Sequence, residues 1–211
     1  MARRSDHSRD EIREMALKAA EAIVEREGAA GLSTRKIANE IGYTAGSLYL
    51  IFENLDDLIF QTNARTLAEL AIELDRAMTR KNDPEAVLVE LSLVYLRFAA
   101  SHRGRWDLIF GPGAPTATAS PEWYRNLVLA LFDRVEKLLA RLDPVRTAPE
   151  VALAARALWG GVHGVCTLAL TDKLDIAGLS DAGKLTTSLI ENFLSGWMRR
   201  NRAAGFEDAC R

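Results

Sequence analysis

The residues whose types and spacing suit contact with another molecule lie in one short segment of this sequence. Five positions between Thr44 and Tyr49 combine hydroxyl groups, small side chains and one aromatic ring. On the front of a short helix, small residues let the backbone come close to a bound surface, and hydroxyl groups can bond to it. The segment therefore predicts a binding surface. Its five residues are Thr44, Ala45, Gly46, Ser47 and Tyr49.

Signatures of enzyme chemistry are missing from the sequence. There is no Gly-x-Ser-x-Gly elbow for a nucleophilic serine, no Glu-x-x-His pair for a di-iron bundle, and no Walker or His-Glu-x-x-His motif. Gly111-Pro112-Gly113 lacks the preceding strand, the third glycine and the lysine of a phosphate-binding loop. We therefore expect no enzyme activity, no catalytic residue, no metal ligand and no cofactor.

Two titratable residues, His163 and Cys166, fall in one apolar helical pattern. A histidine there is more often a hydrogen-bonded core or interface residue, and contact with a ligand or a metal is the alternative. The second cysteine, Cys210, is the penultimate residue, and the pair has no metal-binding spacing. A reducing cytoplasm is the expected compartment, because no disulfide framework is visible.

The net charge of the chain does not by itself indicate nucleic acid binding. The formal net charge is −2, and residues 1–60 contain more acidic than basic residues. Positive charge is local: within residues 31–52, Arg35 and Lys36 face only Glu40. The longest apolar run, residues 157–170, is shorter than the roughly 20 residues of a membrane span. With no signal peptide in sight, we expect a soluble protein with no membrane partner.

Two short helices joined by a tight turn are expected to position the binding residues. Ser33 can cap the first, whose apolar face ends before Gly42, a residue that accepts a positive φ. Thr44 can cap the second, which buries Leu48 and Phe52. The pair indicates a helix-turn-helix, whose second helix places its N-terminal residues on base edges in the DNA major groove. An ordinary αα-corner is the alternative.

The rest of the chain shows helical periodicity and no alternating strand segments. We expect an all-α fold of about nine helices, with Arg103-Gly104-Arg105 as a break before a short turn over residues 106–110. A ridge of small residues from Ala157 to Gly164 predicts close helix packing. The other expected helices cover residues 12–27, 54–80, 84–102, 121–142, 150–170 and about 181–198.

The segment STRKIANEIGYTAGSLYLIFENLDDLI resembles the DNA-binding signature of the TetR (tetracycline repressor) family of bacterial transcription regulators. Trp159, His163 and Gly164 resemble the residues that name the "WHG" subgroup of its C-terminal domains. The resemblance implies a three-helix DNA-binding domain over residues 1–54. A long helix would join it to a ligand-binding and dimerisation bundle over residues 55–211.

The resemblance also implies specific DNA contacts. Ser33, Thr34 and Arg35 would contact phosphates, and the five residues from Thr44 to Tyr49 would face the groove. Arg3 and Arg4 could reach a minor groove, although an unstructured terminus is the alternative. Four positions where the family often has lysine, polar or aromatic residues are apolar, so some contacts would be missing: Ala45, Leu50, Ile51 and Leu55.

A homodimeric repressor that responds to a ligand is the function that the resemblance implies. The last two helices would form the dimer, and its two recognition helices would read a near-palindromic double-stranded operator. Aromatic residues beside the Gly111–Ser120 loop suggest a cavity for a small apolar inducer. A helical-bundle enzyme or a protein-interaction module without DNA binding is the alternative. The expected ligand-binding residues are Tyr95, Phe98, Trp106, Phe110, Trp123, Trp159 and His163.

Overall fold

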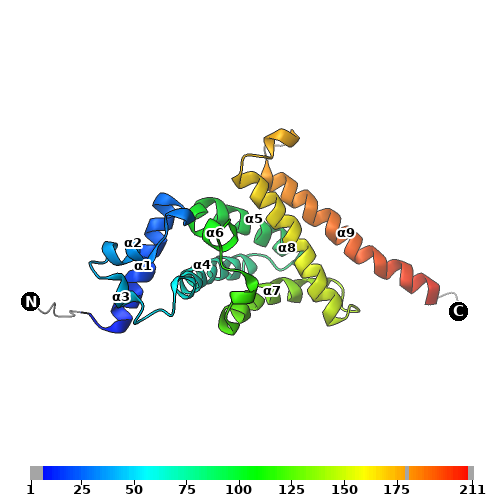
Figure 1. Cartoon of the computed structure of the whole chain (residues 1–211). Coiled ribbons are helices and arrows are strands. Elements are labelled where there is room, and N and C mark those ends of the chain that lie inside the picture. Colours follow the sequence, from blue (N-terminus) through cyan, green and yellow to red (C-terminus); the bar gives the residue numbers. More distant parts are fainter. Residues whose placement is uncertain (1–6, 179–180, 209–211) are drawn as a thin grey trace, which may run out of the picture. The chain divides into compact units, whose positions relative to one another are not determined.

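The computed structural model describes residues 7–178 and 181–208 of the chain (Figure 1). Those ranges contain nine α-helices, three short 3₁₀ turns and no strand, which confirms the expected all-α fold. The helices are α1 (Arg9–Glu27), α2 (Thr34–Glu40), α3 (Ala45–Leu48), α4 (Leu55–Met78), α5 (Pro84–Ser101), α6 (Arg103–Phe110), α7 (Glu122–Leu142), α8 (Ala148–Leu170) and α9 (Ala182–Asp208).

The chain divides into two compact units. Unit 1 comprises Met1–Glu69 and His102–Arg125, and unit 2 comprises Leu70–Ser101 and Asn126–Arg211. Helices α4 and α7 each have residues in both units, so the units are defined by which residues pack together and not by the ends of helices. The functional boundary between residues 54 and 55 is a separate matter and stays a prediction.

The core of unit 1 forms where α1 meets α2, α3 and the start of α4. Helix α1 begins with a capping box, in which the Ser8 hydroxyl accepts from the Glu11 amide and the Glu11 carboxylate accepts from the Ser8 amide. Its apolar stripe then packs on the two short helices and fixes their orientation. The most deeply buried members of this cluster are Ala16, Ala20, Ile23, Ile37, Ala38, Leu48 and Leu58.

Helix α6 corrects one expectation. Arg103-Gly104-Arg105 is not a break between helices, because all three residues belong to α6. Helix α5 ends before them, at Ser101. Gly104 lies where α6 crosses α1, and a Cβ atom there would be 2.1 Å from the carbonyl oxygen of Val24. The glycine therefore serves close packing. Beside it, the buried Arg105 guanidinium donates to Glu25 at 3.2 Å and to Glu69 at 2.9 Å.

Unit 2 is built on the mutual packing of α5, α8 and α9, and α8 and α9 run side by side in Figure 1. Helix α8 starts two residues earlier than expected, since Pro149 is tolerated in its first turn and Thr147 forms a capping box with Glu150. Helix α9 continues well beyond the expected end near Met198. Among the described residues, α8 is the one helix long and apolar enough to cross a membrane by length and composition alone.

Candidate nucleic-acid interface

The α2–turn–α3 segment is held by local hydrogen bonds. The Ser33 hydroxyl accepts from the Lys36 amide at 3.3 Å, and the Thr44 hydroxyl accepts from the Ser47 amide at 3.2 Å. Helix α2 ends in a Schellman motif, in which the Tyr43 amide donates to the Ala38 carbonyl at 2.8 Å and Gly42 has φ of +75°. Both expected caps and the expected positive-φ glycine are confirmed.

The front of α3 is open to solvent while its back is buried. Leu48 and Phe52 are buried in the core of unit 1, as expected. Thr44 and Gly46 are exposed, and Ala45 and Ser47 are half-buried. Tyr49 is 55% exposed, and its hydroxyl donates to Thr34 Oγ1 at 3.4 Å. This hydrogen bond brings the two expected groups of DNA-contacting residues together on one face.

The cations beside this face differ in their partners. Lys36 Nζ lies 2.7 Å from Glu27, whose pKa is held below its usual value by Lys36 first and by Arg26 second. Arg35 is exposed, and it forms no ion pair with a described residue. The guanidinium of Arg35 is therefore available for a phosphate, whereas the ammonium of Lys36 already has a carboxylate partner.

Two residues near this face were not expected from the sequence. His7 Nδ1 lies 2.9 Å from the Tyr43 hydroxyl, and the two rings meet edge to face. The contact joins residues 36 positions apart, so no local spacing could have indicated it. Arg3 and Arg4, the cations of the expected N-terminal arm, lie outside the described residues.

The four apolar residues that depart from the family pattern, Ala45, Leu50, Ile51 and Leu55, differ in their burial. Ile51 and Leu55 are partly buried and pack against the core clusters of unit 1, so their apolar side chains contribute to folding. Ala45 is half-buried on α3. Leu50 is 71% exposed, so packing inside the chain does not explain why this side chain is apolar.

The seven expected ligand-binding residues are divided between the two units. Unit 1 contains Trp106, Phe110 and Trp123. Trp106 is buried, and its ring lies 4.8 Å from that of Phe110. Trp123 is largely exposed. The other four belong to unit 2: Tyr95, Phe98, Trp159 and His163.

Three of the unit 2 residues form a polar cluster between α5 and α8. The Tyr95 hydroxyl lies 2.9 Å from His163 Nδ1 and accepts from Trp159 Nε1 at 3.1 Å. The Trp159 ring stacks on the His163 ring. Burial lowers the pKa of His163 and raises that of Tyr95, so both side chains are neutral at pH 7. His163 is thus a hydrogen-bonded histidine, and its contact with a ligand stays a prediction.

Metal binding finds no support in the described part of the chain, where no three histidine, cysteine, aspartate or glutamate side chains gather. Cys166 is buried and free. Cys210 lies outside the described residues.

One face of α8 is exposed and lined by small and apolar residues. Gly160 and Gly164 lie at its centre, and no atom of the described residues would come within 4 Å of a Cβ atom at either position. Gly161, one position along, faces inward, because a Cβ atom there would be 2.9 Å from Leu189 Cδ2. We call the exposed face the α8 stripe, and it consists of Leu153, Ala157, Gly160, Gly164 and Leu168.

Two protein-family models match the sequence. One, described as "Bacterial regulatory proteins, tetR family", matches residues 16–62, which include α2 and α3. The other, described as "Tetracyclin repressor-like, C-terminal domain", matches residues 88–193, which is half of the chain. These matches confirm the family resemblance. Neither description names the WHG subgroup, which stays a prediction.

Relatives and solved structures agree with these matches. The HTH-type transcriptional regulator Rv0681 of Mycobacterium tuberculosis is 26% identical, over 97% of this chain and 88% of its own length. A TetR-like transcriptional regulator from Rhodococcus sp. RHA1 superposes with a TM-score of 0.61 and 23% identity, covering 88% of this chain and 96% of that chain. The regulator FadR from Bacillus subtilis, solved in complex with stearoyl-CoA, gives a TM-score of 0.63 and 15% identity, covering 87% and 98%. At these identities the two structural likenesses concern the fold.

Proposed function

This chain belongs to the TetR family of bacterial transcription regulators, and we propose that it is a repressor that leaves its DNA operator when a small apolar ligand binds. Its family consists of DNA-binding regulators, typically dimers, rather than enzymes. We therefore propose that the chain has no catalytic activity and acts on DNA in the cytoplasm.

The exposed front of the helix-turn-helix is the observation that carries the DNA-binding proposal. Thr44, Gly46 and Tyr49 are all exposed. Because only small side chains precede Tyr49 on this front, the backbone can come close to base edges in a major groove. Beside it, Arg35, which forms no ion pair with a described residue, would contact phosphates together with Ser33 and Thr34 and fix the orientation of α3.

The α8 stripe supports a homodimer. Glycine in a helix costs about 1 kcal/mol relative to alanine. Gly160 and Gly164 face open space in the described part of the chain, so no packing contact there offsets that cost. Packing of the stripe and of α9 against a second copy would offset it, in an isologous four-helix interface. Two recognition helices would then meet successive major grooves roughly 34 Å apart.

The ligand proposal rests on the buried aromatic residues of unit 2. Phe98 and Tyr95 are buried, while Trp159 and His163 offer aromatic surface with polar atoms. Pockets for small molecules are mostly apolar with a few polar groups that fix orientation. The structurally similar FadR was solved with stearoyl-CoA, a ligand with a long acyl chain. We propose that Trp106, Phe110 and Trp123 also contribute to ligand binding.

The repressor mechanism would follow from differential affinity. A ligand weakens DNA binding only if it prefers the conformation that binds DNA poorly. A coupling free energy of about 1–3 kcal/mol would lower operator affinity by about 5- to 150-fold. This magnitude lies within the usual range for allosteric proteins.

Selection of bound DNA from a random duplex pool tests the proposal. We expect enrichment of a near-palindrome whose half-sites are centred about 10 base pairs apart. Compounds with apolar chains or rings should then release the selected duplex. Failure to enrich any sequence would favour the protein-interaction alternative, and enrichment of an asymmetric site would contradict the symmetric dimer.

A further inference from the structure

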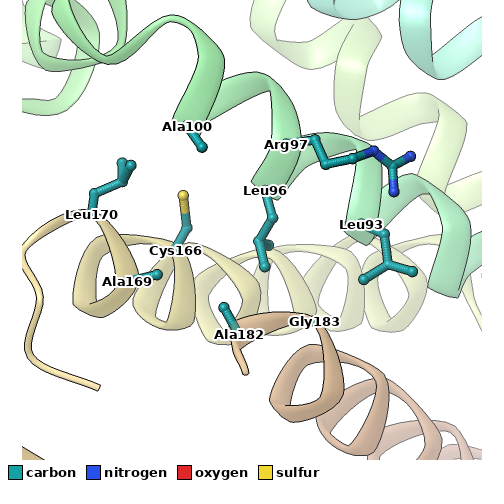
Figure 2. Close-up of a pocket in the computed structure, with 9 residues that line it drawn as sticks. All are labelled: Leu93, Leu96, Arg97, Ala100, Cys166, Ala169, Leu170, Ala182 and Gly183. Atoms are coloured by element: carbon teal, nitrogen blue, oxygen red, sulfur yellow. The ribbon is translucent and has the colours of Figure 1, made fainter. Parts of the chain in front are cut away.

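Unit 2 contains a pocket that includes none of the seven residues expected to bind the inducer. It lies between α5, the end of α8 and the start of α9, has a volume of about 340 Å³ and opens to solvent (Figure 2). This volume lies at the low end of the range for small-molecule sites, about 300–1,000 Å³. The lining residues are Leu93, Leu96, Arg97, Ala100, Cys166, Ala169, Leu170, Ala182 and Gly183.

The wall of this α5–α8–α9 pocket is apolar. Figure 2 shows the side chains of Leu96, Cys166 and Leu170 directed into the space between the three helices. Burial raises the pKa of the Cys166 thiol to about 11, so the sulfur is neutral at pH 7 and acts as part of the apolar wall. An aliphatic chain suits such a wall better than a polar ligand does, because the side chains of the described lining residues other than Arg97 are apolar.

Among the described lining residues, Arg97 is the one that is charged. Its side chain is 60% exposed, and its Nη2 donates to Glu90 Oε1 at 2.9 Å. Figure 2 shows the guanidinium above Leu93 and away from Cys166. A guanidinium has five N–H donors, and the bond to Glu90 uses one of them. Donors therefore remain for a second anion at the solvent side.

The α5–α8–α9 pocket shares no residue with the α8 stripe. Cys166 and Ala169 line the pocket, whereas Gly160 and Gly164 belong to the α8 stripe on another side of the same helix. Pairing of two chains through the stripe would therefore leave these lining residues available to a ligand.

We propose that this pocket binds an aliphatic chain that ends in an anionic group, with the chain against Leu96, Cys166 and Leu170 and the anion paired with Arg97. The proposal goes beyond the inducer site, because it concerns a second ligand position that shares no residue with the first. It does not depend on DNA binding and can be tested on the protein alone.

Calorimetric titration with decanoate on the full chain tests the site. We expect saturable binding with a negative heat-capacity change, which marks burial of apolar surface. Ala100→Trp and Ala169→Trp should fill the pocket and weaken decanoate binding at least tenfold. Ser101→Trp is the matched control, since Ser101 is exposed on the same helix but does not line the pocket.

The charge requirement is tested with two analogues of equal chain length. Decanol should bind more weakly than decanoate, and decylammonium more weakly still. Arg97→Gln should weaken decanoate by about 2- to 5-fold, the range of an exposed ion pair, and leave decanol unchanged. Decanoate binding that survives both tryptophan substitutions would overturn the site. Equal loss of decanoate and decanol in Arg97→Gln would overturn the role of Arg97.

Discussion

Glycines within two helices, α6 of unit 1 and α8 of unit 2, show how the same residue serves opposite ends. At Gly104 the backbone of α1 lies so close that a Cβ atom would be 2.1 Å from a carbonyl oxygen. At Gly160 and Gly164 a Cβ atom would meet no described residue within 4 Å. Gly104 is thus explained by packing inside one chain. Gly160 and Gly164 are not, and this difference directs attention to a second chain.

Gly104→Ala should give the largest effect. The methyl group would collide with the backbone around Val24 and Glu25, and backbone atoms cannot rotate away as a side chain can. We expect a loss of about 3 kcal/mol in the free energy of unfolding, at the upper end for overpacking. Chemical denaturation measures it. Gly46→Ala is the control, because the nearest atom to a Cβ there, Thr44 Oγ1, is 3.7 Å away and stability should hardly change.

Gly160→Leu or Gly164→Leu should leave each chain folded but separate the dimer. A leucine on the α8 stripe has room within one chain, and it would prevent close approach of a second copy. Light scattering should give half the mass of the unsubstituted protein. Ala140→Leu places the same side chain at an exposed position of α7 and should leave the mass unchanged. A dimer that persists in both glycine variants would place the interface elsewhere.

Tyr49→Ala should weaken operator binding by about tenfold or more without unfolding the chain, because the ring is exposed on the groove-facing side. Tyr49→Phe should have a smaller effect, since it removes only the long hydrogen bond to Thr34. Anisotropy with a labelled duplex measures the affinity. A fall in thermal stability with unchanged affinity would assign Tyr49 to the core instead.

His163 should produce the smallest effect. Because burial lowers its pKa in the folded protein, the unfolded chain binds the proton more readily. Stability should therefore fall as the pH drops below about 6.5, the ordinary histidine value. His163→Gln should lack this part of the pH dependence in denaturation curves. An identical pH profile in the variant would show that His163 does not contribute.

The sequence predicts the local features of this fold well. Ser33, Thr44, Asn54 and Asp83 each accept a hydrogen bond from an amide three residues ahead, so residue type and spacing are enough to find the caps. Residue type and spacing also identify the buried face of each helix, because apolar residues recur with the helical period. The helix-turn-helix could therefore be predicted together with its exposed front.

Features that depend on distant partners could not be predicted. Arg105 donates a hydrogen bond to Glu25, which lies 80 positions away in the sequence. From its local sequence, the neighbouring Gly104 is expected to interrupt a helix. The same holds for the contact of His7 with Tyr43 and for the α5–α8–α9 pocket. Each joins segments that are distant in the sequence, and the helical periodicity does not relate such segments to one another. Only the packing of helices brings these residues together, and local patterns do not specify which helices pack.

Salt-dependent binding of the selected duplex by the unsubstituted protein, Arg35→Gln and Lys18→Gln tests the central claim most directly. Each lost phosphate contact should reduce the slope of log affinity against log salt by about 1. We predict that reduction for Arg35→Gln, and an unchanged slope for Lys18→Gln, because Lys18 lies on α1 and pairs with Glu14. Equal slopes in all three proteins, or equal affinity for the selected and a scrambled duplex, would contradict recognition of DNA through this helix-turn-helix.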